Sequence, residues 1–124
     1  MIQRTIITSR YQYILNLNPG NVFRTVTTDI TPDMGAVGKF YDPFWDSWVE
    51  KAKMDPDAAA IVHAYRHRPR EEMFDPSADP YQRKNLANDP ELAGVRRALR
   101  KQLADWCRQQ GDTEAIQQSQ LTAE

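Results

Sequence analysis

Two histidines are spaced four residues apart, at His63 and His67. In a helix, this spacing places both imidazole rings on one face, where the pair can chelate zinc. The sequence offers no third ligand beside them, and protein zinc sites use three or four. We therefore interpret both residues as partly exposed helix histidines and predict no metal site there.

Between residues 71 and 90, three aspartates stand directly before prolines, at Asp75, Asp79 and Asp89. Carboxylate oxygens are ligands that hard divalent cations prefer. In turns and at helix starts, however, the same oxygens accept hydrogen bonds from nearby backbone N–H groups. We expect this local use, with Asp89 as a helix N-cap, so the sequence predicts no metal ligand among the three.

Arginines occupy alternate positions at Arg66, Arg68 and Arg70. A guanidinium group can bind a sulfate or carboxylate through two parallel hydrogen bonds. These three side chains are therefore the candidate substrate-binding residues. Two other interpretations stay open: the segment is a solvated loop, or its arginines form ion pairs with Glu71 and Glu72.

A second basic group consists of Arg96, Arg97, Arg100 and Lys101. The whole chain carries 16 Lys plus Arg against 17 Asp plus Glu, a net charge of −1. A nucleic-acid-binding domain is usually basic overall. We therefore predict no nucleic-acid partner and expect these four side chains on the solvated outer face of a helix.

Composition limits the fold further. A chain of 124 residues can bury one ordinary core, and its single cysteine excludes an internal disulfide. No apolar run approaches the roughly 20 residues that span a bilayer, and the first residues lack the apolar segment of a secretory signal. We predict neither a membrane span nor a signal peptide, and we expect the true N-terminus to lie further upstream.

Short blocks follow one another in a fixed order between Glu71 and Pro90. They are Glu72-Met73-Phe74-Asp75, Asp79-Pro80, Asn85-Leu86-Ala87 and Asp89-Pro90. This order resembles the C-terminal signature of the type I sulfatases: an acidic residue, Leu or Met, an aromatic residue, Asp, a spacer, then Asp-Pro-x-Glu-x-x-Asn-Leu-Ala. Gln82 stands where that signature usually has Glu, so we expect a neutral hydrogen bond there in place of a charged contact.

A block upstream adds to the resemblance. Arg10-Tyr11-Gln12-Tyr13-Ile14 is similar to the Arg-Tyr-Lys-Tyr strand that precedes the signature in sulfatases. Together with Asn16-Leu17-Asn18 and the wide insertion before Glu71, it most resembles the heparan N-sulfatase (sulfamidase) branch. The resemblance runs from about Arg4 to Asp112, which identifies residues 1–112 as a C-terminal subdomain and residues 113–124 as a polar tail.

The resemblance implies a parent protein that hydrolyses sulfate esters or sulfamates of sulfated sugars. The family's nucleophile is a formylglycine, matured from the first residue of Cys/Ser-x-Pro-x-Arg, and its cofactor is calcium; both belong to a catalytic domain that this chain lacks. The only cysteine, Cys107, is not followed by the required proline, and no Ser-x-Pro-x-Arg occurs. We predict no catalytic residue here and interpret Cys107 as a small helix residue beside Trp106.

The role implied for this chain is structural. We expect it to pack on the absent catalytic domain and to be inactive alone. Two alternatives stay open: a stand-alone protein-interaction module with the same fold, or a module that binds sulfated polyanions through Arg66, Arg68 and Arg70.

A small antiparallel sheet must position these residues. The β-branched run Ile2–Thr8 predicts a strand, and the apolar alternation across Tyr11–Leu17 predicts its hairpin partner. Glu71–Phe74 predicts another strand, ending near Asp75, and Val22–Ile30 a further short one. The predicted fold class is therefore α+β, with a sheet of about three or four strands.

A long C-terminal helix, Pro90 to Gln110, is predicted to cover the sheet and to end at Gly111. Its apolar residues recur at steps of three and four and form a narrow stripe. They are Leu92, Val95, Leu99, Leu103 and Trp106. The Gln- and Ser-rich tail that follows is expected to be frayed or partly helical.

The insertion, residues 40–68, is predicted to be helical and rich in aromatic residues. One helix runs from Asp42 to about Met54, and Asp55 caps a second that ends before Pro69. The aromatic region Phe40–Trp48 packs into the domain's own core or forms an apolar surface for a partner, which is the absent catalytic domain or a second copy of this chain. We favour a partner surface for some of these rings and expect the chain to self-associate.

Overall fold

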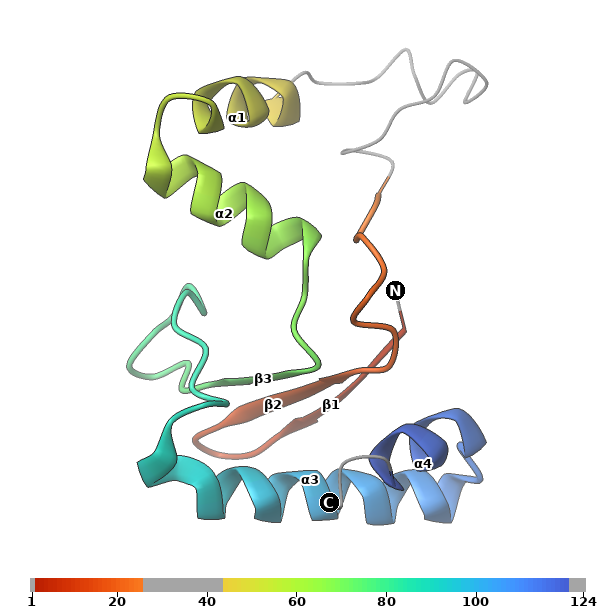
Figure 1. Cartoon of the computed structure of the whole chain (residues 1–124). Helices are drawn as coiled ribbons and strands as arrows, with labels where there is room; N and C mark the ends of the chain where they lie inside the picture. The colour runs from red at the N-terminus through yellow and green to blue at the C-terminus, as the bar shows by residue number, and fades with distance from the viewer. Residues whose placement is uncertain (1, 26–43, 121–124) are drawn as a thin grey trace. The chain divides into compact units, whose positions relative to one another are not determined.

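The computed structural model describes residues 2–25 and 44–120, which form two compact units (Figure 1). The first unit consists of Met1–Pro19 and Pro69–Glu124. The second unit, Gly20–Arg68, is inserted between those two stretches of sequence.

The first unit is built on an antiparallel sheet with the strand order β1-β2-β3. β1 (Gln3–Ile7) and β2 (Gln12–Asn16) form a hairpin, and β3 (Glu71–Phe74) pairs with the other side of β2. In the hairpin turn, Thr8 N–H donates to Tyr11 O at 2.9 Å, and the Thr8 hydroxyl oxygen accepts from Tyr11 N–H. The predicted hairpin, the strand before Asp75 and the α+β class are confirmed.

One face of the sheet carries the apolar core. Tyr13, Leu15 and Leu17, which alternate along β2 and just beyond it, are each at most 3% exposed, and Met73 lies opposite Tyr13. Side chains alternate between the two faces of a strand, so these residues point the same way. The opposite face also holds buried side chains: Ile14, Asn16, Glu72 and Phe74.

The long helix α3 (Ala93–Gln110) packs on the core face of β1 and β2 (Figure 1). One 3₁₀ turn, Pro90–Leu92, precedes it, and Asp89 Oδ1 accepts the Glu91 N–H at 2.9 Å. α3 ends at Gly111, whose φ of 69° lies in the left-handed region that glycine adopts without strain. Both predicted ends of this helical segment are confirmed.

The buried stripe of α3 differs from the predicted one at its C-terminal end. Leu99, Leu103 and Cys107 are at most 5% exposed, whereas Trp106 remains 52% exposed. Residues four apart stay on nearly one side of a helix, while neighbours are rotated by about 100°. The small thiol of Cys107 therefore takes the core position, and Trp106 lies beside β1.

The tail begins as a helix, α4 (Thr113–Gln120), so its predicted helical character is confirmed. Asp112 starts it by accepting the Ala115 N–H at 3.2 Å, and Ala115 is buried against the core. Only one small apolar residue attaches this helix to the core, so the sequence pattern indicated a frayed or partly helical tail. Residues 121–124 of the predicted tail lie outside the described residues.

The second unit contains helices α1 (Phe44–Ala52) and α2 (Pro56–Arg66). Asp55 caps α2 as predicted, since its Oδ1 accepts the Asp57 N–H at 2.9 Å and the Ala58 N–H at 3.2 Å. Among the described residues, no helix is long and apolar enough to cross a membrane.

The further strand predicted at Val22–Ile30 is wrong for residues 22–25, which form no strand. Phe23 instead donates its N–H to Arg66 O at 2.7 Å and packs edge-on against Tyr65, with ring centroids 5.4 Å apart. The rest of that predicted strand, residues 26–30, lies outside the described residues.

Candidate functional site

The three candidate substrate-binding arginines are divided between the two units. Arg66 and Arg68 belong to the second unit, and Arg70 belongs to the first. The Arg66 guanidinium lies over the Trp45 ring, 5.4 Å from its centroid, which is a cation–π contact. All three side chains belong to half-buried residues. Their substrate-binding role stays a prediction.

Glu71 binds Arg100, which lies 29 residues further along the chain. Arg100 Nε donates to Glu71 Oε1 at 2.8 Å, and Arg100 Nη2 donates to Oε2. The Tyr13 hydroxyl also donates to Oε1. The side chains of Glu71 and Arg100 are 14% and 20% exposed, so this network joins β2, β3 and α3 where little water reaches it.

Burial and hydrogen bonding act in opposite directions on the pKa of Glu71 and in the same direction on that of Tyr13. Burial acts to raise the pKa of Glu71, but hydrogen bonds from Arg100 and Tyr13, with the charge of Arg100, outweigh it and hold that pKa below its ordinary value. Burial, together with the bond to Glu71, raises the pKa of Tyr13. Glu71 is therefore a carboxylate and Tyr13 a neutral donor at pH 7.

The prediction that four basic residues lie on the solvated face of α3 is correct for two of them. Arg97 and Lys101 are exposed, whereas Arg96 and Arg100 are half-buried. Arg96 Nη1 donates to Ala87 O at 2.5 Å, so it holds the loop before α3. The prediction fails for Arg96 and Arg100 because each has an acceptor in a segment that the helix pattern does not contain.

Asp75 and Asp79 act locally, as predicted. Asp75 Oδ1 accepts two backbone N–H groups of the following turn, and its Oδ2 accepts Arg10 Nε at 3.0 Å. This contact with Arg10 holds the pKa of Asp75 below its ordinary value. Asp79 Oδ2 accepts the Lys84 N–H at 2.8 Å. Within residues 2–25 and 44–120, no three His, Cys, Asp or Glu side chains gather as a metal site would require.

The two histidines stack on each other, and the cysteine is buried. His63 and His67 are exposed and their rings stack, with centroids 4.4 Å apart. Cys107 is 1% exposed, and burial raises the pKa of its thiol, so it is a protonated core residue at pH 7.

The Asn-Leu-Ala block of the signature closes the outer edge of β3. Asn85 Oδ1 accepts the Met73 N–H at 2.9 Å, and its Nδ2 donates to Glu71 O at 3.1 Å. Leu86 N–H donates to Met73 O at 2.7 Å, and Ala87 is 2% exposed. These residues therefore replace a neighbouring strand.

The neutral hydrogen bond expected at Gln82 is present. Gln82 Nε2 donates to Gln12 Oε1 at 2.7 Å, which connects the turn after β3 to β2. In the sulfatase pattern described above, position 82 is usually Glu and position 12 is usually Lys. The amide pair thus occupies positions at which that pattern has an acidic and a basic residue.

The aromatic region is divided between packing and exposure. Trp45 is 6% exposed and lies 5.0 Å from Tyr65, ring centroid to ring centroid. Phe44 and Trp48 are 47% and 39% exposed. Phe40 and Tyr41 lie outside the described residues, so a partner surface over Phe40–Trp48 stays a prediction.

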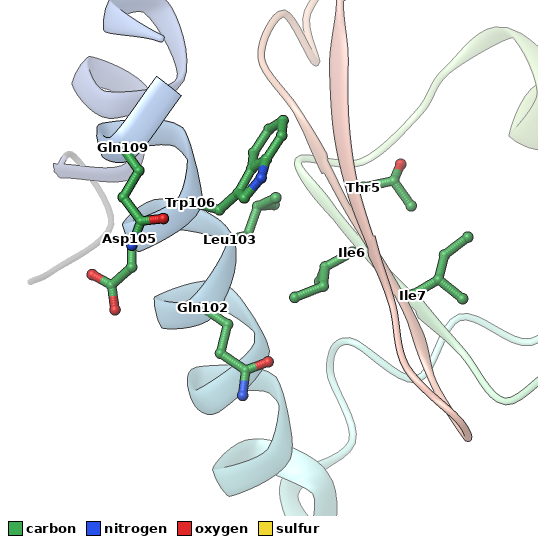
Figure 2. A pocket seen from close by; sticks show the side chains of 8 residues that line it. All are labelled: Thr5, Ile6, Ile7, Gln102, Leu103, Asp105, Trp106 and Gln109. Atoms are coloured by element: carbon green, nitrogen blue, oxygen red, sulfur yellow. The ribbon is translucent and has the colours of Figure 1, made fainter. Parts of the chain in front are cut away.

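A groove of about 490 Å³ lies between β1 and α3. It is lined on one side by Thr5, Ile6 and Ile7, and on the other by Gln102, Leu103 and Trp106. Figure 2 shows Leu103 and Trp106 reaching from the helix toward the strand, with Ile6 pointing toward the helix and Ile7 away from it. The helical periodicity predicted Trp106 to lie on the buried stripe, so the sequence did not indicate this groove.

The chain is similar to parts of sulfatases. Over 54 residues, 44% of the chain, it is 43% identical to an ulvan-active sulfatase of Formosa agariphila, covering 9% of that protein. Over 109 residues, 88% of the chain, it is 28% identical to an ulvan-active sulfatase of the same organism, covering 18%. Over 42 residues, 34% of the chain, it is 48% identical to human N-sulphoglucosamine sulphohydrolase, covering 8%.

These matches confirm the resemblance to sulfatases. No protein-family model matches the chain. The chain spans between 8% and 18% of the length of these curated relatives.

Proposed function

We propose that this chain is the non-catalytic C-terminal part of a sulfatase that hydrolyses sulfate esters or sulfamates of sulfated sugars. The substrate class follows from the resemblance and from the relatives, an ulvan-active sulfatase and an N-sulphoglucosamine sulphohydrolase. The chain contributes structure, and it packs on the catalytic part of the parent protein.

The use of the signature residues carries this proposal. Met73, Phe74 and Ala87 are buried, Asp75 and Asp79 hold turns, and Asn85 closes the edge of β3. A catalytic motif would leave polar groups converging on a cavity. These groups are engaged with the chain's own backbone and with Arg10, which favours a scaffold role.

The aspartates and the cysteine that the structure describes do not fit the family's cofactor or nucleophile. Calcium takes six to eight oxygen ligands, whereas the carboxylates of Asp75, Asp79 and Asp89 accept local N–H groups. Cys107 is buried without the surrounding motif. Under the proposal, calcium and formylglycine belong to the catalytic part.

The test is to read the coding DNA upstream of Met1, to express its product and the chain alone, and to measure sulfate release from an aryl sulfate and from N-sulfoglucosamine. We expect a continuing frame that contains Cys/Ser-x-Pro-x-Arg, activity in the long product and none in the chain alone. A stop codon shortly before Met1 would overturn the proposal. The stand-alone protein-interaction module would then be the remaining hypothesis. Sulfate release by the chain alone would overturn the non-catalytic role.

A contact between Arg66, Arg68 and Arg70 and the sulfated substrate is a separate proposal. It is supported by their spacing and by the affinity of guanidinium groups for sulfate. Replacing all three by Ala should abolish salt-dependent retention of the chain on heparin, because charge contacts weaken as salt screens them. Equal retention of the unmodified chain and the triple variant on heparin would contradict this substrate-binding role.

A further inference from the structure

The two edges of the sheet differ. The outer edge of β3 is closed by Asn85 and Leu86. At β1, Leu17 N–H donates to Ile2 O and Thr8 N–H to Tyr11 O, each at 2.9 Å. In an antiparallel ladder, hydrogen-bonding residues alternate, so the even-numbered residues of β1 are bonded to β2.

The backbone groups of Thr5 and Ile7 consequently point away from the sheet. Neither has a hydrogen-bond partner on that side among the described residues. The Ile7 side chain is 72% exposed, and the strand carries no proline, a residue that blocks pairing at natural edges. Its one charged side chain, Arg4, lies on the core face and is paired with Asp112 of the same copy. β1 is thus an edge that can accept another strand.

We propose that β1 pairs with β1 of a second copy of this chain, antiparallel and about a twofold axis at Thr5. Thr5 then lies opposite Thr5 of the second copy, and Gln3 opposite Ile7 of the second copy. All are odd-numbered, so their outward N–H and C=O groups form hydrogen-bonded pairs. Gln3 O also accepts Arg4 Nη1 at 3.0 Å, and a carbonyl oxygen has a second lone pair for the added strand. The result is a continuous six-stranded sheet.

The charges of the strand allow this register. Arg4 lies opposite Ile6 of the second copy, so the two Arg4 side chains do not face each other. Each Arg4 is also paired within its own copy, since its Nε donates to Asp112. Like charges opposite each other would destabilise the pair, and this register avoids them.

The helical layer explains why the partner is a second copy. α3 packs on β1 and β2, so its axis lies over that pair of strands. A twofold axis at the β1 edge then separates the two α3 axes by two strand spacings, about 10 Å, and packed helices lie about 8–10 Å apart. The two Trp106 side chains, half exposed in one copy, would cover each other. A lone strand from another protein region would bring no helix to cover them.

The test is sedimentation velocity on the full 124-residue chain over a concentration series, with variants at the twofold axis. Thr5→Pro removes the outward N–H without removing a bond to β2, an arrangement that edge strands tolerate, and we expect a monomer. Thr5→Val keeps that N–H and should dimerise like the unmodified chain. Trp106→Gln changes an exposed side chain and should raise the dimer Kd at least about tenfold, which corresponds to about 1.4 kcal/mol. Far-UV circular dichroism checks that each variant is folded.

The outcomes separate this interface from others. If the chain is monomeric at every concentration up to millimolar, the proposal is overturned. The β1 edge would then be expected to pair with a strand of a larger protein. A dimer that persists in Thr5→Pro and Trp106→Gln but dissociates in Trp48→Lys also overturns it, because the interface is then the aromatic region. Loss of the dimer in Thr5→Pro, with retention in Thr5→Val and Trp48→Lys, supports it.

Discussion

Glu71 connects three elements through a single carboxylate, which receives hydrogen bonds from Arg100 and Tyr13. Arg100→Met keeps the length and apolar stem of the side chain but leaves this carboxylate without its cation. Removing one partner of a largely buried, charge-assisted pair costs on the order of 2–3 kcal/mol. We expect that loss in the free energy of unfolding, measured by urea denaturation followed by circular dichroism.

The matched control for Arg100→Met is Lys101→Met. Lys101 pairs with Asp105 at the surface, where the two side chains are 77% and 38% exposed, and exposed pairs contribute little. We expect a change below about 0.5 kcal/mol. Equal effects of the two substitutions would contradict the role assigned to Arg100.

The pKa of Glu71 predicts an acid-dependent loss of stability. Because the folded pKa lies below the ordinary value of 4.5, the unfolded chain takes up the proton first as pH falls. The contribution of the Glu71 carboxylate is therefore fully present above the unfolded pKa and is lost as pH falls through the folded pKa. Urea midpoints of the unmodified chain and Glu71→Gln should differ most at pH 7, and the difference should shrink as pH falls from 4.5 through the folded pKa. A constant difference would refute this linkage.

The pair Gln12 and Gln82 can be converted to the usual sulfatase residues. Gln12→Lys with Gln82→Glu should form an ion pair at the same place, since the two side chains already meet at 2.7 Å. A double-mutant cycle by urea denaturation should give a favourable coupling of about 0.5–1 kcal/mol. The coupling should decrease in 1 M salt, where charges are screened beyond about 3 Å. A coupling of zero would mean that the side chains separate once charged.

At the scale of elements, Asn85 supplies the edge of β3 that a fourth strand would otherwise occupy. Asn85→Ala removes three hydrogen bonds, to Met73, Ala87 and Glu71, and net contributions of about 1 kcal/mol each predict a loss of about 2–3 kcal/mol. Asn88→Ala is the matched control, because Asn88 is exposed and its change should stay within about 0.5 kcal/mol. Urea denaturation measures both, and a similar small effect of each would show that water replaces Asn85.

The elements that the sequence predicts are those signalled within a few residues. The alternation along β2, the cap at Asp55 and the stop at Gly111 are local patterns, so their structures match the prediction. The misses depend on distant residues: Arg100 finds its acceptor 29 residues away, and Arg4 finds Asp112 across 108.

The sequence gives similarly partial information about the candidate site. Periodicity alone places residues 106 and 107 almost equally well on the buried stripe, and only the packed sheet decides that Cys107 is inside. The groove beside Trp106 exists because Cys107, and not Trp106, packs into the core. No local pattern therefore predicts the groove. The signature residues, in contrast, are local turn and strand formers, and their scaffold role is consistent with the resemblance.

At the scale of the whole molecule, the first unit contains its complete sheet and its covering helix. The two stretches that form it meet where Asn16 N–H donates to Arg70 O at 2.8 Å and Asn16 Nδ2 donates to Pro69 O at 2.6 Å. The chain therefore leaves and re-enters this unit at neighbouring points. A short loop can join Pro19 to Pro69 without displacing β2 or β3.

Replacing residues 20–68 by a short Gly-Asn loop should leave a folded first unit, because closing a short loop in place of a long one costs little. Trp45 and Trp48 are removed with the second unit, so Trp106 becomes the only tryptophan and its fluorescence reports the packing of α3 on β1. We expect one cooperative urea transition, shifted to lower urea when Arg100→Met is added. A gradual transition that Arg100→Met does not shift would show that the sheet and α3 depend on the second unit for their order.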